Sequence, residues 1–327
     1  MARCSLCSSR AVAYVRYARL YLCREHFHQF FLDRVRRTIE RYSLIKPGQR
    51  VLAALSGGKD SSAMALALAE LSKSMGFEVV ALHIDLGIEG YSPTQLSAVQ
   101  NLAKRLGLPL IVVDLRRALG VNVAKLAHRV RRAVCSVCGL VKRYVMNVAA
   151  SLARADSVAT GHNADDVLAY VLKTMLVGGG EEYARKLVPR TEALPGAVPR
   201  IRPLYETYER ETLLMCVVSG LPYEHTPCPH APRTSIEREI KRFLSRVEEL
   251  APGTKIRLVR RVARGELGPT IGGTQSESAV SRCSRCGFIA RGDVCSFCRI
   301  TERALGFAGG PRIVEYIDEI VRGLGLG

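Results

Sequence analysis

Residues 56–61, Ser-Gly-Gly-Lys-Asp-Ser, combine groups that bind phosphate with a carboxylate suited to Mg²⁺. Adjacent glycines let backbone N–H groups approach an anion without a Cβ in the way. The serines add hydroxyl donors, the lysine offsets phosphate charge, and the following helix N-terminus attracts anions. We therefore predict a phosphate cradle; a glycine turn that serves only architecture is the alternative. The residues assigned to the cradle are Ala54, Ser56, Gly57, Gly58, Lys59, Asp60, Ser61 and Ser62.

The spacing of these residues excludes two common phosphate-binding loops. A Walker A loop requires G-x-x-x-x-G-K-[ST], and a dinucleotide loop requires G-x-G-x-x-G; neither pattern occurs here. The motif instead resembles the PP-loop of the ATP pyrophosphatase superfamily, whose members split ATP between the α and β phosphates. An apolar strand before it, an alanine-rich helix after it and Ala-Leu-His-Ile-Asp one unit later strengthen this resemblance, which implies ATP with Mg²⁺ as the ligand.

Apolar strands and amphipathic helices alternate around this loop. This alternation predicts an α/β fold, a parallel sheet with helices on both faces, in which ligands bind outside the carboxyl ends of the strands. The expected strands are 50–56, 77–85, 108–115 and 156–163, and the expected helices are 27–45, 59–75, 93–106, 142–154 and 164–177. Further candidate ligands of ATP at the strand ends are His83, Asp85, Gly161, Asp165 and Asp166, and His162 lies among them.

These strand-end residues have different expected roles. His83 and Asp85 are placed near the nucleoside. Asp165 and Asp166 could bind Mg²⁺ or orient the base, and Asp165 is the candidate cap of the helix that follows. His162 fits a structural role as well as a functional one.

Cysteine pairs at both ends of the chain have the spacing of zinc ligands. Two close pairs joined by a short segment place four ligands at tetrahedral corners, and four protein ligands leave no open position for catalysis. We predict a Cys3His knuckle in residues 1–30 and a Cys4 knuckle in residues 251–327, flanking a catalytic domain at 31–250; His28 is the alternative to His26. The ligands are Cys4, Cys7, Cys23 and His26 for the first site and Cys283, Cys286, Cys295 and Cys298 for the second.

The composition points to a polyanionic partner. The 327 residues include 48 basic and 30 acidic residues, a net charge of +18, and such an excess favours binding to phosphates through counterion release. The arginine- and glycine-rich connector after residue 250 could contact RNA or be a solvated pair of basic strands. With no run of eighteen apolar residues and no leader before the first cysteine motif, we expect a cytoplasmic protein.

Four of the eleven cysteines are not used by the two knuckles. Cys216 lies in an apolar helical stretch and is expected in the core. The chain resembles the TtuA/NcsA family in a combination of motifs. These are the terminal knuckles, the PP-loop, C-x-x-C-G-x-x-K-R at 135–143, Gly-His-Asn-Ala-Asp-Asp at 161–166 and a late cysteine-proline turn. The members of this family are ATP-dependent tRNA 2-thiouridine synthetases, and the resemblance covers nearly the whole chain, from Cys4 to Cys298.

The resemblance implies a 4Fe-4S cluster held by Cys135, Cys138 and Cys228, with one iron free of protein ligands. Disulfide or persulfide chemistry at these cysteines and a third zinc site are the alternatives. The resemblance also makes Lys142, one helical turn after Cys138, a catalytic candidate, although it could instead contact phosphate or RNA. Asp60 and Asp166, as carboxylates that could act through Mg²⁺, are the other catalytic candidates.

In such a reaction the 2-oxygen of a tRNA uridine is adenylated and then replaced by sulfur from a thiocarboxylated ubiquitin-like protein or from sulfide. The residues Arg129, Arg131 and Arg132 are candidate tRNA contacts, and the resemblance implies a homodimer. Another PP-loop modifier of tRNA, such as a cytidine thiolase or a lysidine synthetase, is the alternative enzyme. A zinc-ribbon RNA-binding protein without catalysis is the non-enzymatic alternative. Thiolation in the T-loop and at the wobble position both fit the sequence.

Overall fold

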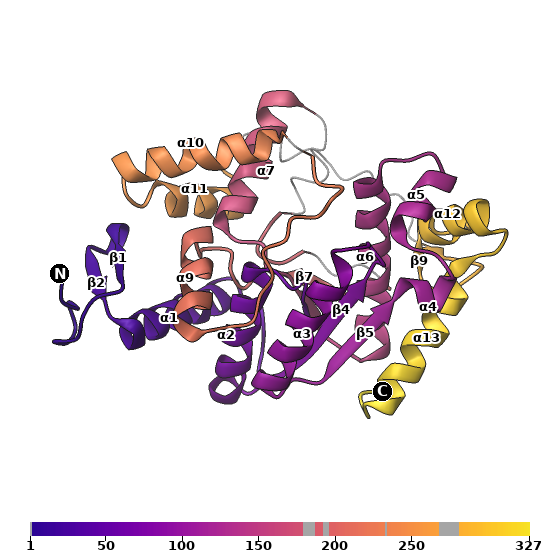
Figure 1. Ribbon diagram of the computed structural model, residues 1–327, viewed down its shortest axis with the longest axis horizontal. Helices are drawn as coiled ribbons and strands as arrows, with labels where there is room; N and C mark the ends of the chain where they lie inside the picture. The colour runs from indigo at the N-terminus through magenta and orange to yellow at the C-terminus, as the bar shows by residue number, and fades with distance from the viewer. Residues whose placement is uncertain (1, 179–186, 192–195, 233, 268–280) are drawn as a thin grey trace.

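A five-stranded parallel sheet forms the centre of the computed structural model, which describes residues 2–178, 187–191, 196–232, 234–267 and 281–327 (Figure 1). The strand order is β5-β4-β3-β6-β7, so the chain reverses its direction of winding beside β3, which lies in the middle. The strands are β3 (Arg50–Ala54), β4 (Glu78–Asp85), β5 (Leu110–Asp114), β6 (Ser157–Ala159) and β7 (Arg200–Ile201). The predicted parallel α/β fold is confirmed.

Helices cover both faces of the sheet because successive side chains of a strand point to opposite sides. In β3, Val51 and Ala53 pack into one core while Leu52 packs into the other. On the first face lie α1 (Arg24–Arg41), α2 (Lys59–Met75), α3 (Ser92–Leu106) and α9 (Glu209–Ser219). On the second lie α4 (Leu115–Leu119), α5 (Val123–Arg129), α6 (Val134–Leu152), α12 (Ser296–Leu305) and α13 (Gly309–Gly323).

A third apolar cluster joins three helices beyond the carboxyl ends of the strands (Figure 1). Val171, Leu244 and Val259 are buried in it, one from each helix. The helices are α7 (Ala164–Val177), α10 (Ile236–Leu250) and α11 (Thr254–Ala263). The region after residue 250, expected to be a connector, therefore begins with a packed helix; residues 268–280 of it lie outside the described residues.

Helix α6 begins eight residues before the start predicted at Lys142. The apolar period continues through the cysteine pair that precedes Lys142. Val137, Val141, Val145 and Val148 are all buried on one side of the helix. Cys135 and Cys138 consequently lie in the first two turns of a helix.

Each end of the chain adds a short antiparallel hairpin. The N-terminal hairpin pairs β1 (Ala13–Val15) with β2 (Leu20–Leu22), joined by the 3-10 turn Arg16–Ala18, and the C-terminal one pairs β8 (Ser281–Arg282) with β9 (Ile289–Ala290). Among the described residues, no single helix has the length and apolar character to cross a membrane. The bent pair α5 and α6 meets those criteria by length and composition only.

Candidate active site

The phosphate cradle follows β3 and ends at the N-terminus of α2. The Ser61 hydroxyl donates to the carbonyl of Gly58 at 2.9 Å and accepts from the backbone N–H of Ser56 at 3.2 Å, which closes the loop. Gly57 has a φ of +89°, and a Cβ there would lie 2.4 Å from the Gln95 side-chain oxygen. Gly57 is therefore required both by backbone conformation and by space.

A second loop, after β6, presses against the cradle. A Cβ on Gly161 would lie 2.9 Å from the backbone nitrogen of Ser61 and 3.1 Å from the carbonyl carbon of Asp60. Only glycine allows this approach without displacing the backbone of α2. The two loops predicted from separate sequence motifs are thus brought into direct contact.

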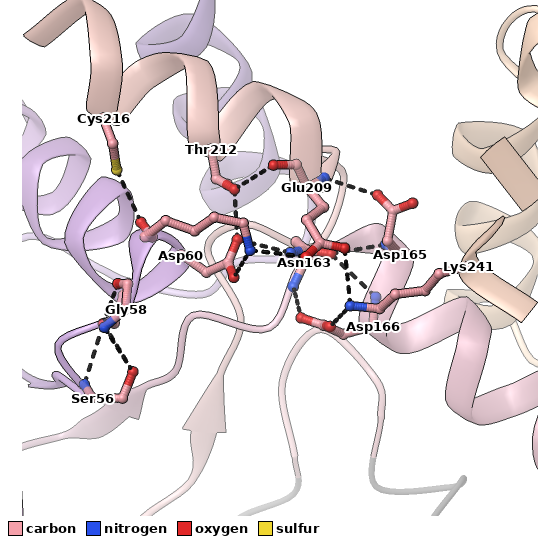
Figure 2. A network of polar contacts seen from close by, with 12 residues as sticks. Ser56, Gly58, Asp60, Asn163, Asp165, Asp166, Glu209, Thr212, Cys216 and Lys241 are labelled. Carbon is pink, nitrogen blue, oxygen red and sulfur yellow. Dashed lines mark hydrogen bonds and ion pairs between the residues drawn. The ribbon is translucent and has the colours of Figure 1, made fainter. Parts of the chain in front are cut away.

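Lys59 and Asp60 lie in a network of alternating charges (Figure 2). The Lys59 ammonium donates to the carboxylates of Asp60 and Glu209, at 2.8 Å each. Asp60 also accepts from the Thr212 hydroxyl at 2.5 Å and the Asn163 amide at 3.1 Å. Burial raises the pKa of Asp60, and Lys59 opposes that rise. The network fixes the direction of both PP-loop side chains before any ligand binds.

Glu209 continues the network toward α10. It also accepts from the Lys241 ammonium at 3.1 Å, and Lys241 donates to Asp166 at 2.5 Å. Burial alone would raise the pKa of Glu209, but the adjacent Lys241 and Lys59 outweigh it and lower the pKa to about 2. Glu209 is therefore ionised at neutral pH, between two cations.

The sequence interpretation assigned the cap of α7 to the wrong residue. Asn163 is the N-cap: its side chain accepts from the backbone N–H groups of Asp165 and Asp166, while Asp166 accepts from the N–H of Asn163. Asp165 is instead buried, accepting from the Lys255 ammonium at 2.6 Å and from the first N–H of α9 at 2.8 Å. Its contacts are structural, whereas Asp166 faces the charge network.

A pocket of about 100 Å³ opens between the cradle and β4. Ala54, Ser56 and His83 line it, together with Lys142 from α6. The His83 Nδ1–H donates to the carbonyl of Leu55 at 2.9 Å, and burial lowers the pKa of the ring. The imidazole is therefore neutral, and among the described residues its buried Nε2 acceptor has no partner. An acceptor of this kind suits the amino group of a nucleobase.

Asp85 and His162 do not line this pocket, and their contacts are local. Asp85 accepts from the backbone N–H of Gly87 at 2.7 Å, which stabilises the turn after β4, and it does not line the pocket. The ring of His162 contacts the Thr160 hydroxyl at 2.9 Å, and burial lowers its pKa.

The third cysteine group, Cys135, Cys138 and Cys228, lies near Lys142. Burial raises the pKa of Cys138, Lys142 lowers it through charge and a hydrogen bond, and the thiols of Cys135 and Cys228 raise it. All three cysteines and the lysine are therefore close enough to interact. Cys138 and Cys228 pack on the same core, and the Cys135 thiol approaches the carbonyl of His230 at 3.5 Å, in the loop that carries Cys228.

These three thiols are not grouped as closely as the ligands of the two knuckles. Their sulfur atoms do not all lie within 4.8 Å of one another, as those of the two knuckles do. Sulfur ligands of this kind suit an iron-sulfur group. Cys216, by contrast, is fully buried and its thiol donates to the Lys59 carbonyl at 3.2 Å, so its predicted place in the core is confirmed.

Both terminal groups have the geometry of closed metal sites. In the first, Cys4 and His26 Nδ1 are 3.5 Å apart and the sulfurs of Cys7 and Cys23 are 3.7 Å apart. In the second, the sulfurs of Cys286 and Cys295 are 3.9 Å apart. Each set fits one tetrahedral ion. His28 pairs with Glu70 instead, so the first set contains His26.

The C-terminal knuckle also supports α6. The ring of Tyr144, on α6, stacks on Phe297 of the knuckle at 4.0 Å. A Cβ on Gly310 of α13 would lie 2.4 Å from the Cys298 sulfur, so α13 packs directly on the candidate metal ligands. This knuckle therefore helps to hold the helix that carries Cys135, Cys138 and Lys142.

Sequence reasoning missed several members of the charge network. Nothing local to Glu209, Lys241 or Thr212 marks them as partners of the cradle. Asn163 could have been found, because Asn-x-x-Asp before an apolar helix is a capping box.

The fold and the cradle together define a PP-loop protein of the ATP pyrophosphatase type. The PP-loop domain family matches residues 28–240, and the N-terminal LIM domain of the 2-thiouridine synthetase TtuA matches residues 3–28. A Pyrococcus horikoshii protein named tRNA-5-methyluridine(54) 2-sulfurtransferase is 37% identical over 91% of this chain and 93% of its own. A Thermus thermophilus protein of the same name is 39% identical over 91% and 90%.

The structure also resembles that of the U34-tRNA thiolase NcsA from Methanococcus maripaludis with its [4Fe-4S] cluster. The TM-score is 0.74 at 27% identity, and the match covers 93% of this chain and 95% of that one. The chain belongs to the TtuA/NcsA family of tRNA thiolases.

Proposed function

We propose that this protein is an ATP-dependent tRNA sulfurtransferase that adenylates the 2-oxygen of a uridine and then replaces that oxygen with sulfur. Oxide is a poor leaving group, and attachment of AMP converts it into a good one. The observation that carries the proposal is the position of Lys142, which lines the nucleotide pocket and lies close enough to Cys138 to lower the pKa of that thiol. One side chain thus joins the site of activation to the site of sulfur delivery.

The first half of the reaction uses the cradle. Ser56, Gly57 and Gly58 bind the triphosphate of ATP, and two of the three donors of Lys59 are already directed by Asp60 and Glu209. The third donor remains for a phosphate oxygen. Asp60 and Asp166 are the carboxylates suited to the accompanying Mg²⁺. The uridine oxygen attacks the α-phosphorus, pyrophosphate leaves, and the nearby Lys142 ammonium offsets the developing charge.

The second half uses the thiols. Cys135, Cys138 and Cys228 would hold a 4Fe-4S cluster, which when bound supplies an iron without a protein ligand that can accept sulfide. Sulfide adds to the activated carbon of uridine, and AMP departs with the original oxygen. Lys142 keeps its ammonium beside the same carbon and stabilises the charged adduct. The supplier of sulfur is proposed to be a thiocarboxylated ubiquitin-like protein or free sulfide.

We further propose that the target lies in the T-loop. Two relatives named for uridine 54 are 37% and 39% identical to this chain, whereas the neighbour named for uridine 34 is 27% identical. Two zinc ions in the terminal knuckles, a homodimer and a cytoplasmic location complete the proposal. Mass spectrometry of nuclease fragments of the product tRNA identifies which of the two positions carries sulfur.

The decisive experiment is anaerobic purification followed by iron and sulfide analysis and a thiolation assay with tRNA, ATP and sulfide. About four iron and four sulfide per chain and a 2-thiouridine product are expected. Asp60→Ala should bind tRNA normally and release no pyrophosphate. A protein that binds ATP but holds no cluster and incorporates no sulfur would contradict the proposed function.

A further inference from the structure

Helix α10 forms one wall of an open hollow of about 630 Å³ that neither ATP binding nor thiol ligation explains. Four basic side chains of α10 line it: Arg238, Lys241, Arg242 and Arg246. The three arginines are four residues apart, so they lie along one face of the helix. All three are exposed, whereas Ile240 and Leu244 on the other face are buried against α7 and α11.

The acidic residues around the hollow are already paired with other cations. Glu209 accepts from Lys59 and Lys241, and Glu237 accepts from Lys173 at 2.6 Å. Arg242 pairs with Glu239 at 2.7 Å, but both side chains are about two-thirds exposed, so this contact is weak. In the part of the chain that the structure describes, Arg246 has no ion-pair partner. The hollow therefore has an excess of positive charge.

The hollow adjoins the reaction centre directly. Glu209 and Lys241 are part of its lining. Glu209 forms an ion pair with Lys59 of the cradle, and Lys241 forms one with Asp166 at the start of α7. A uridine that reaches the cradle is covalently joined to phosphates on both sides. These phosphates must lie near the walls of the site. Figure 1 shows α10 and α5 on opposite sides of the carboxyl edge of the sheet.

We propose that the arginine face of α10 is an RNA docking surface, which binds the backbone phosphates of the nucleotides that flank the target uridine. The inference rests on the proposed function and names how its RNA substrate is held. Exposed guanidinium groups at helical spacing contact successive phosphates without reading sequence. The phosphates of ATP or of pyrophosphate are the other source of the same chemistry, and the test separates the two.

The test compares Arg242→Ala and Arg246→Ala with Arg322→Ala on α13. Arg322 is a matched control, because it is exposed, lies on a surface helix and pairs with Asp318 four residues away, at 2.6 Å. The affinity for tRNA is measured by filter binding without ATP at several KCl concentrations. The affinity for a non-hydrolysable ATP analogue is measured by calorimetry.

Each α10 variant should bind tRNA roughly 3- to 10-fold more weakly and lower the slope of log affinity against log salt by about 1. Arg246→Lys should recover most of that loss. The Arg322→Ala control should match the wild type, and all variants should keep the affinity for the ATP analogue.

Equal tRNA affinity of the α10 variants and the control would overturn the inference, as would a loss confined to the ATP analogue. The binding assay requires no turnover. A wild-type protein that binds tRNA through α10 but never thiolates it would overturn the proposed function and leave this docking surface intact.

Discussion

The Lys59 ammonium and the Glu209 carboxylate form an ion pair of 2.8 Å although 150 residues separate them in the chain. Glu209 is the first residue of α9, and its other oxygen accepts from Lys241 of α10. The PP-loop lysine is thus positioned by two helices that follow the nucleotide-binding strands. The cradle is complete only when the C-terminal part of the catalytic domain has packed onto it.

Replacement of Glu209 should reveal this dependence in the stability of the protein. We expect Glu209→Gln to lower the free energy of unfolding by about 1–2 kcal/mol at pH 7, because it leaves Lys59 and Lys241 each with one fewer carboxylate. The pKa of Glu209 is lowered from 4.5 to about 2 in the folded protein. Its contribution is therefore fully present above pH 4.5 and is lost as the pH falls toward 2.

Urea unfolding of wild type and Glu209→Gln between pH 7 and pH 2.5 measures this contribution. The difference between the two proteins should shrink across the acidic part of that range. Glu315→Gln, at an exposed position of α13, is the control and should show no difference at any pH. A difference for Glu209→Gln that stays constant with pH would contradict the ion-pair explanation.

The sequence predicted four of the five strands, the cradle and the terminal knuckles because each depends on local patterns, and it missed the two-residue strand β7. Apolar runs marked β3 and β4, and cysteine pairs marked ligands three residues apart. It could not predict that Lys255 would neutralise Asp165, since that contact joins residues 90 positions apart and neither has a local signature. Burial decided the role of Asp165, and burial follows from packing of α11 on α7.

Lys142 is expected to act in catalysis rather than in binding of the cluster. Lys142→Met should reduce thiolation by about 100-fold or more, because it removes a charge stabiliser from both halves of the reaction, while iron and sulfide content stays at the wild-type level. Arg143→Ala is the matched control: the residue is adjacent but exposed, and it does not line the pocket. Thiolation is measured under single-turnover conditions with saturating ATP. Loss of iron in Lys142→Met would assign the lysine a structural role.

Cys216 and Cys228 belong to neither knuckle and lie outside α6. Their substitution should have opposite effects on iron content. Cys228→Ser should lose most of its iron and all thiolation, because it removes one of the three proposed cluster ligands. Cys216→Ala should retain both and lose about 1–2 kcal/mol of unfolding free energy, since it deletes a fully buried sulfur. Burial raises the pKa of Cys216 to about 12, so its thiol stays protonated and unreactive. Iron analysis, alkylation with iodoacetamide and urea unfolding measure these differences; rapid alkylation of Cys216 in the folded protein would be inconsistent with its place in the core.

Gly161 should tolerate no side chain, because the contact between the two active-site loops leaves no room for one. Its φ is not positive, so alanine fits the backbone, but the added Cβ would lie within 3.1 Å of backbone atoms of Asp60 and Ser61. These atoms belong to the first turn of α2 and cannot rotate away as a side chain would. We expect Gly161→Ala to lower the free energy of unfolding by about 1–3 kcal/mol and to weaken binding of ATP, since the shift would separate Asp60 from Asn163.

The control is Gly323→Ala at the end of α13, where a Cβ meets no atom within 4 Å and a slight stabilisation is expected. Urea unfolding and calorimetry with an ATP analogue test both variants, and equal behaviour of the two would show that the loops are not in the close contact described here.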